Sequence, residues 1–148
     1  MSQRQNADVI EPACPFCEAI AGDVPVRTVL DDDVAIAFLD RSPVFKGHVL
    51  VAPKRHTVTL ADLDADLVGG LFERVQLVSA RMPAALGCDG TFVAINNVVS
   101  QSVAHLHVHV VPRRRKDGLR GFFWPRVKYD SDAEADDFAR RLTEAFAG

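Results

Sequence analysis

The sequence predicts an α+β domain in which an antiparallel sheet is covered by one long helix. Short apolar segments separated by turn residues follow one another along the first half of the chain, as expected for strands in hairpin order. One long segment with helical spacing, residues 64–86, separates them from two further strand-like segments. The 148 residues, of which 48% are hydrophobic and 25% charged, suit a single core. We therefore expect one domain over residues 13–148, preceded by a flexible polar leader over residues 1–12.

The first half of the chain predicts one short helix and three strands. Gly22 is placed to end a helix over residues 14–21, since glycine readily adopts the left-handed conformation that closes a helix. Three aspartates at residues 31–33 suit a tight turn between two strands. The third strand is expected to end at Pro53, which cannot donate to a ladder. The expected strands are Val26–Leu30, Val34–Leu39 and Gly47–Val51.

The long helix is expected over Asp64–Leu86. Its start has two candidate N-caps, Asp62 and Asp64, and a glycine follows its last residue. Two glycines at residues 69–70 and Pro83 are poor helix residues, so weakness or a kink is expected near each. The apolar residues that recur at helical spacing and form its core stripe are Leu67, Leu71, Val75, Val78 and Met82.

The second half predicts two strands and a C-terminal helix. The fourth strand is expected over Thr91–Ile95, and a helix over Asp132–Phe146 follows from the spacing of its apolar residues. Between them, the aromatic residues Phe122–Trp124 suit either a core or a substrate-facing position.

The fifth strand is expected over Val103–Val111, where histidines alternate with apolar residues. Period-two alternation places the imidazoles on one face of a strand, and Pro112 marks its end. Three imidazoles on one face need three sets of partners, which favours a metal site or a catalytic imidazole over chance. The outer two lie ~13 Å apart along a strand, so one ion would hardly bind all three. The three histidines are His105, His107 and His109.

These motifs resemble the histidine triad (HIT) family of nucleotide hydrolases and transferases. The family signature alternates three histidines with apolar residues after Gln-Ser or Gln-Thr, as in Gln101–Val111 here. The resemblance implies a HIT-like α+β single domain with a five-stranded antiparallel sheet, one long helix and short helices. It also implies a homodimer joined through the long helix and the fourth strand. The other matching segments, in family order, are Cys14–Cys17, Ala37–Asp40, Gly47–His48 and Pro53–His56.

The resemblance implies cleavage at the α-phosphorus of a nucleotide without a catalytic metal. His107 is then the nucleophile, which suits an imidazole because part of it is unprotonated at neutral pH. His109 would donate to a phosphate oxygen, and His48 would support the site. Gln101 and Ser102 would hold the phosphate and the leaving group. Without the resemblance, His48 reads as a loop histidine and the Gln-Ser pair as loop residues.

The resemblance also implies where the nucleoside binds. Asp40 would accept hydrogen bonds from the ribose hydroxyls, although a turn-forming role fits it equally from sequence. Phe16 and Leu39 match positions of the apolar base pocket, for which core packing is the alternative. Arg41 stands where many relatives have an apolar pocket residue, so base preference is open. Asn96 and Asn97 both suit a substrate contact, and Ser100 replaces a family glycine near the phosphate.

A structural zinc ion is the cofactor that the resemblance implies. Some bacterial relatives bind zinc through a C-x-x-C pair, a later histidine and the first histidine of the triad. The matching residues here are Cys14, Cys17, His56 and His105. A Cys2His2 set is a closed tetrahedral site, which suits structure rather than catalysis. A redox-active C-x-x-C is the alternative.

Composition argues against several classes of protein. The net charge of −3 provides no field that would attract nucleic acid or a membrane surface. No apolar segment is long enough to span a bilayer, and the first residues lack a signal-peptide core, so we expect a cytoplasmic protein. The basic cluster Arg113–Lys116 suits a solvated loop, with phosphate steering as the alternative.

The sequence therefore predicts a nucleoside-phosphate hydrolase or nucleotidyl transferase. The expected substrates are adenosine phosphoramidates or dinucleoside polyphosphates, with release of a nucleoside monophosphate. Aminoacyl-adenylates also remain open, since the leaving group cannot be read from the residues. Two other functions stay in view: a zinc-dependent hydrolase that uses the triad histidines, and a non-catalytic nucleotide-binding regulatory module.

Overall fold

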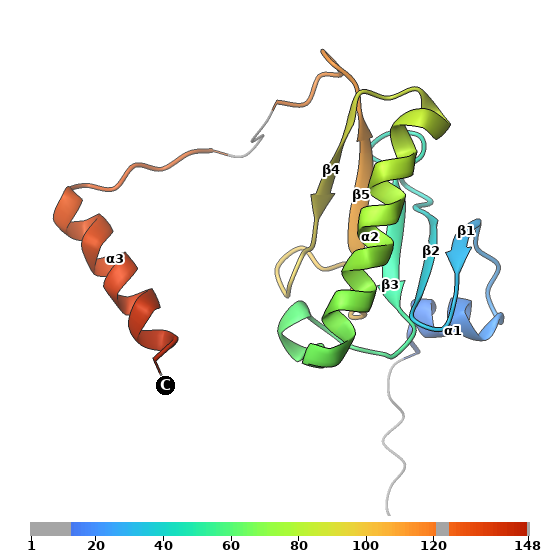
Figure 1. The fold of residues 1–148 in the computed structure, drawn as a ribbon, viewed down its shortest axis with the longest axis horizontal. Helices are drawn as coiled ribbons and strands as arrows, with labels where there is room; N and C mark the ends of the chain where they lie inside the picture. The colour runs from blue at the N-terminus through green and yellow to red at the C-terminus, as the bar shows by residue number, and fades with distance from the viewer. Residues whose placement is uncertain (1–12, 121–124, 148) are drawn as a thin grey trace, which may run out of the picture. The chain divides into compact units, whose positions relative to one another are not determined.

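The computed structural model describes residues 13–120 and 125–147. In this part of the chain, five antiparallel strands form one sheet in the order β1-β2-β3-β5-β4, and α2 lies across one face (Figure 1). The predicted α+β class with a five-stranded antiparallel sheet is confirmed. The elements are α1 (Pro15–Ala21), β1 (Thr28–Asp31), β2 (Ala35–Leu39), β3 (Val49–Pro53), the 3-10 helix η1 (Leu60–Asp62), α2 (Ala65–Leu86), β4 (Gly90–Ala94), β5 (Val108–Arg113) and α3 (Asp132–Ala145).

The chain divides into two units, with the division between Arg115 and Lys116. The first unit holds the sheet with α1 and α2, and the second holds α3. The predicted domain limits of 13–148 stay a prediction. The predicted leader over residues 1–12 and the aromatic group Phe122–Trp124 lie outside the described residues.

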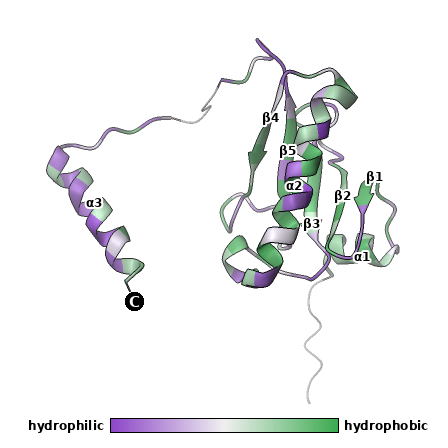
Figure 2. Ribbon diagram, viewed as in Figure 1, coloured by the Kyte–Doolittle hydropathy of each residue, from purple (hydrophilic) through white to green (hydrophobic). Residues whose placement is uncertain are grey.

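The main core lies between α2 and the sheet. Leu71, Val75, Val78 and Met82 of α2 are buried there, as the helical spacing predicts. Figure 2 shows that α2 carries both apolar and polar residues, as expected for a helix with one face in the core. The sheet contributes alternate residues to this core, namely Ala35, Ala37, Val49, Val51, Val108 and Val110.

Helix α2 runs unbroken through the residues that were expected to weaken it. Gly70 permits a close approach, since a Cβ there would lie 3.2 Å from the Val34 side chain. Pro83 falls in the last turn, where its carbonyl accepts from Gly87, whose left-handed conformation (φ 67°) ends the helix. Asp64 occupies the N-cap position without a side-chain cap bond, whereas Asp62 forms a capping box with the N-cap of η1.

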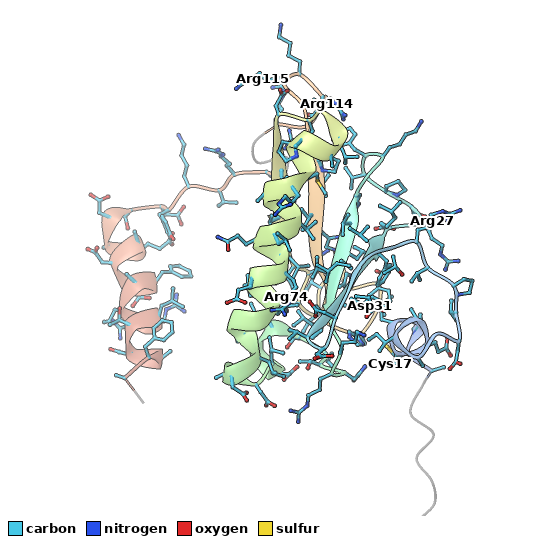
Figure 3. All side chains as sticks on the ribbon, turned by 45° about the vertical axis from the view of Figure 1, so that its right-hand side comes forward. Cys17, Arg27, Asp31, Arg74, Arg114 and Arg115 are labelled. Carbon is cyan, nitrogen blue, oxygen red and sulfur yellow. The ribbon has the colours of Figure 1, made fainter. Side chains whose placement is uncertain are left out.

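The aspartates between β1 and β2 form the turn that their composition predicts. The Oδ1 atom of Asp32 accepts from the backbone N–H groups of Val34 (2.9 Å) and Ala35 (3.0 Å). These two bonds, helped by Arg74, lower the pKa of the Asp32 carboxyl. Arg74 projects from α2 toward this turn (Figure 3), and its Nε donates to Asp32 Oδ2 at 3.0 Å. The turn is thereby tied to the long helix.

The fifth strand begins later than predicted. β5 starts at Val108 and runs to Arg113, so His109 lies in the strand while His105 and His107 precede it. The segment before the strand is held elsewhere, because the N–H of Leu106 donates to Thr57 O at 2.6 Å. Pro112 does not end the strand as expected. Pairing with β3 stops at Val110, so Pro112 has a partner on the β4 side alone.

Helix α3 in the second unit confirms the C-terminal helix. Its N-cap is Ser131, a residue type that helices prefer at this position, and the Ser131 side chain accepts from the N–H of Glu134. Its apolar residues Phe138 and Leu142 are exposed. Within the described residues, no helix is both long and apolar enough to cross a membrane.

Candidate active site and metal centre

The three histidines of the triad are in contact with one another through rings and backbone. The ring centroids of His107 and His109 lie 5.0 Å apart, and the Phe16 ring makes T-shaped contacts with His105 (5.8 Å) and His107 (5.0 Å). His105 is fully buried and His107 is 4% exposed. Phe16 belongs to α1, so this short helix walls the site from one side.

His107 is held in one tautomer by the backbone. Its Nδ1 lies 2.7 Å from the carbonyl oxygen of His105. A carbonyl oxygen only accepts, so Nδ1 carries the hydrogen. In the neutral ring Nε2 then has its lone pair available. This is the nitrogen that the predicted nucleophilic role requires.

His48 and His109 form a hydrogen-bonded pair, and a backbone contact determines which ring donates. The N–H of Val44 donates to His48 Nδ1 at 3.1 Å, so the neutral His48 ring carries its hydrogen on Nε2. That Nε2 lies 2.9 Å from His109 Nδ1, which therefore accepts. His109 is left with its hydrogen on Nε2. This buried atom has no hydrogen-bond partner among the described residues.

Both rings of this pair are neutral at pH 7. Burial, followed by the charges of His107 and His48, lowers the pKa of His109 to about 4, and Asp40 opposes the shift. Burial also lowers the pKa of His48, against the effect of Asp40. The pair of uncharged rings therefore presents one buried N–H donor, the Nε2–H of His109.

Asp40 forms the turn that is one of the two roles the sequence leaves open. Its Oδ1 accepts from the N–H of Ser42 at 2.9 Å, which makes it a turn residue. Its Oδ2 lies 3.7 Å from His48 Nδ1. The side chain is 22% exposed, so this second oxygen is placed to accept further hydrogen bonds. Arg41, next to it, is exposed.

The apolar group beside the histidines differs from the predicted one by a single residue. Phe16 is present, with its ring 5.2 Å from that of Phe38. Leu39 instead packs with the α2-facing core, because neighbouring residues of a strand point to opposite faces. On the side of the sheet that carries Phe16, the structure places Phe38 and Leu50, and Leu50 pairs with His109. Period-two alternation along β2 was the signal that identifies Phe38.

The loop before the triad uses two of its polar side chains for its own structure. Gln101 Nε2 donates to Val58 O at 2.6 Å, and its Oε1 accepts from Val98 N at 3.1 Å. Asn97 Oδ1 accepts from Leu60 N at 2.9 Å. Asn96 and Ser102 are exposed. Ser100, which replaces a family glycine, adopts the left-handed conformation that glycine prefers (φ 60°).

Four residues form a group that can hold a metal ion, and we call them the metal-ligand group. One ligand atom from each of Cys14, Cys17, His56 and His105 lies within 4.8 Å of the others. Cys14 caps α1, with the N–H of Cys17 3.4 Å from its sulfur, and no disulfide joins the two cysteines. Cys17 lies on α1 (Figure 3).

The spacing of these atoms fits tetrahedral coordination. Zinc–sulfur bonds of about 2.3 Å and zinc–nitrogen bonds of about 2.0 Å require sulfur and nitrogen about 3.5 Å apart, and two nitrogens about 3.3 Å apart. Sulfur–nitrogen distances here are 3.4 Å (Cys14 to His105) and 3.3 Å (Cys17 to His56). The Nδ1 atoms of His56 and His105 are 3.2 Å apart.

The outer contact of His105 completes the fit. Its Nε2 donates to Pro53 O at 2.8 Å, which leaves Nδ1 unprotonated toward the two sulfurs. Metal-binding histidines usually hold their second nitrogen in this way. Burial lowers the pKa of His105, which favours the neutral ring that a metal requires.

A second group of potential ligands consists of Asp40, His48 and His109. Its two rings are already hydrogen-bonded to each other. Within the described residues, no such group joins two histidines of the triad. This arrangement does not favour the zinc-dependent hydrolase that the sequence left open.

Comparison with known proteins agrees with these observations. A crystal structure of a HIT family protein from Bacillus subtilis superposes with a TM-score of 0.81 at 30% identity, covering 90% of this chain and 96% of the other. A zinc-bound histidine triad family protein from Mycobacterium smegmatis matches at 33% identity with a TM-score of 0.69, covering 91% and 96% of the two chains.

An enzyme is also among the relatives. The adenosine 5′-monophosphoramidase of Schizosaccharomyces pombe is 31% identical over 115 residues, which cover 76% of this chain and 84% of the other. The HIT domain matches residues 21–116, a range that contains the triad and starts just after the C-x-x-C pair. With the sheet, the triad and this match in agreement, the chain belongs to the HIT family.

Proposed function

We propose that this protein is a nucleotide hydrolase or nucleotidyl transferase that cleaves adenosine phosphoramidates through a covalent nucleotidyl-His107 intermediate. The observation that carries the proposal is the pair of tautomers at the site. His107 has an unprotonated Nε2, and His109 has a buried Nε2–H without a partner. A nucleophile and an unsatisfied donor next to each other are what attack on a phosphate group needs.

In the first step, the lone pair of His107 Nε2 forms a bond to the α-phosphorus. The bond from phosphorus to the leaving amine breaks, its electron pair leaves with the amine, and the amine takes a proton from water. The Nε2–H of His109 donates to a non-bridging oxygen. His48 keeps that hydrogen in place through its bond to Nδ1 of His109.

In the second step, water attacks the same phosphorus atom. The phosphorus–nitrogen bond to His107 breaks, its electron pair returns to Nε2, and water loses one proton. The product is AMP. The His105 carbonyl holds the ring for both steps, so orientation supplies part of the rate enhancement.

The remaining contacts follow from which polar atoms are available. Ser102 is exposed and is assigned to the leaving group. Asn96 is assigned to the substrate, because the amide oxygen of Asn97 is already used by Leu60. Gln101 serves the phosphate side by holding the loop, since both ends of its amide are bonded to backbone.

The nucleoside would lie on the face of the sheet that carries Phe16. Asp40 Oδ2 accepts from the ribose hydroxyls while Oδ1 keeps the turn. Phe16, Phe38 and Leu50 supply the apolar wall for the base. Arg41, exposed beside Asp40, contributes to base preference.

We further propose that the metal-ligand group binds a structural zinc ion and that the reaction needs no catalytic metal. A bound zinc ion joins α1 to the loop of His56 and to the segment before β5. Reduced cysteines are required for this, which agrees with a cytoplasmic location.

A homodimer is the proposed assembly. Apolar side chains are exposed on the outer side of α2 and on the edge strand β4, namely Val68, Phe72, Leu77 and Val93. Exposed apolar groups of this kind mark interfaces between proteins. Light scattering coupled to gel filtration should give twice the mass of one chain.

Mass spectrometry of the quenched reaction tests the chemistry. After acid-free quenching, the wild type should gain the mass of one AMP on His107, because the phosphorus–nitrogen bond is labile in acid. A substrate with a chiral α-phosphorothioate should react with retention, since two in-line displacements restore the configuration. Inversion without a covalent adduct would exclude the two-step path. AMP binding without any turnover would favour the regulatory module instead.

A further inference from the structure

Residues 57–60 form a short linker between the metal-ligand group and the loop that precedes the triad. The linker follows His56 directly and is bonded three times to residues 97–106. Each bond joins a different residue of the linker, so the two segments are held along their length. The bonds run from Leu106 N–H to Thr57 O (2.6 Å), from Gln101 Nε2–H to Val58 O (2.6 Å) and from Leu60 N–H to Asn97 Oδ1 (2.9 Å).

The loop at residues 97–100 is strained. Val98 has φ 67°, and the N–H of Val99 donates to Asn97 O at 2.8 Å, which closes a three-residue turn of the rare strained kind. Ser100 has φ 60°. A β-branched residue with positive φ is an outlier, and such residues persist where the surroundings hold them.

Packing does not offset this strain. The side chains of Val98 and Val99 are 76% and 78% exposed, so neither is buried against the described residues. The contacts that hold the loop are the side-chain bonds of Asn97 and Gln101 to the linker and to Val98. The strain is therefore balanced by two amide side chains.

We infer that Asn97 is a positioning residue for the phosphate-binding loop. Its amide oxygen fastens the start of the loop to Leu60, while Gln101 fastens the end of the loop to Val58. Ser102 and the triad follow directly. The inference rests on the proposed function, because it assigns to this loop the phosphate and leaving-group side of the substrate. Asn97 does not itself contact the substrate.

The choice of Asn97 over its neighbour is specific. Asn96 and Asn97 are both exposed, yet Asn97 alone of the two has a side-chain hydrogen bond across to the linker among the described contacts. Two adjacent asparagines thus divide the work, one toward the substrate and one toward the loop. This predicts different kinetic signatures for their alanine variants.

The test compares Asn97→Ala with Val99→Ala, a variant in the same loop that changes an exposed side chain. Titration calorimetry with AMP should show a dissociation constant about 5-fold higher for Asn97→Ala, the effect of one lost hydrogen bond. KM should rise similarly while kcat stays within about 2-fold, because His107 is untouched. Hydrogen exchange at the Leu60 amide should become faster. Val99→Ala should match the wild type in all of these, and the metal content of both variants should be unaltered.

Two further variants separate the bond from the fold. Asn97→Asp keeps an acceptor for Leu60 N–H, so exchange at Leu60 should stay at the wild-type rate. Leu60→Pro removes the donor of the same bond at the first helical position, where proline is tolerated, and should reproduce the loss of AMP affinity. It serves as the test if Asn97→Ala does not fold.

The inference is overturned if Asn97→Ala keeps wild-type AMP affinity and wild-type exchange at Leu60. A loss of kcat with unchanged KM would equally overturn it, since that pattern indicates a direct part in the chemistry. If the wild type binds no AMP, the proposed function fails, and exchange at Leu60 still decides whether Asn97 holds the loop.

Discussion

The metal-ligand group and the proposed catalytic site contain histidines only two residues apart, His105 and His107, yet these two rings present opposite nitrogens. His105 donates from Nε2 to Pro53 O and turns Nδ1 toward the cysteines. His107 donates from Nδ1 to the carbonyl of His105 and keeps Nε2 available. The residue type is the same in both cases. A nearby backbone carbonyl selects which nitrogen can act, and thereby whether the ring suits a metal or a phosphorus atom.

Removing the nucleophile should produce the largest effect and leave the metal-ligand group intact. His107→Ala should lower kcat by ~10³-fold or more, because the covalent step is lost while binding groups remain. Steady-state kinetics and elemental analysis measure the two sides of the comparison. Zinc content equal to the wild type is expected. Near-normal turnover in this variant would mean that the two groups do not divide the work as proposed.

Breaking the metal-ligand group should affect stability more than chemistry. Cys17→Ser should lower the free energy of unfolding by about 3 kcal/mol or more, since metal binding to a folded site stabilises that fold. Urea unfolding and zinc content check this result. Cys88→Ala is the matched control, because Cys88 lies in the α2-facing core and outside the group, so its zinc content should be unaltered. A zinc-free wild type would contradict the proposal.

Acid should destabilise the folded protein through His109 in a defined range of pH. The folded protein keeps His109 neutral down to about pH 4, whereas the unfolded chain takes up that proton near the ordinary pKa of 6.5. The stabilisation is therefore complete above pH 6.5 and is lost as pH falls to about 4, a total of about 3 kcal/mol. The free energy of unfolding, measured with urea at several pH values between 7 and 4, should fall less steeply with decreasing pH for His109→Gln than for the wild type. Equal slopes would refute the assignment.

Replacing Asp40 should produce the smallest of these effects, and it tests whether this turn residue also binds the ribose. Asp40→Ala should raise KM about 10-fold or more, because a charge-assisted hydrogen bond to ribose contributes about 1.5–3 kcal/mol. A substrate that lacks the ribose hydroxyls measures the same contact from the other side and should bind the variant and the wild type equally. If KM for the normal substrate is unchanged in a folded variant, Asp40 is a turn residue alone.

Element order could be predicted because it depends on local patterns, and the membership of the metal-ligand group could be predicted because its residues match a known family. The core residues of α2 follow from helical spacing, and the resemblance to HIT proteins carried the four metal-ligand positions. The start of β5 could not be predicted. It depends on the bond from Leu106 N–H to Thr57 O, a contact between segments far apart in the sequence.

The tautomers and the role of Asn97 were likewise beyond the sequence. Each depends on which backbone atom lies opposite a side chain after folding, and no spacing rule encodes this. The assignment of Leu39 to the base pocket stays a prediction. Alternation along β2 indicates that Phe38, and not Leu39, shares a face with Phe16.

Helix α1 has a consequence for how this protein is divided and engineered. Its seven residues supply Phe16 against the nucleophile and carry Cys17, with Cys14 as the cap. The part that matches the HIT domain begins at residue 21, where α1 ends. A fragment cut at that boundary would keep every histidine and lose Cys14, Cys17 and Phe16. A chimera that exchanges HIT domains must therefore carry the N-terminal helix and its cap, Cys14, with it.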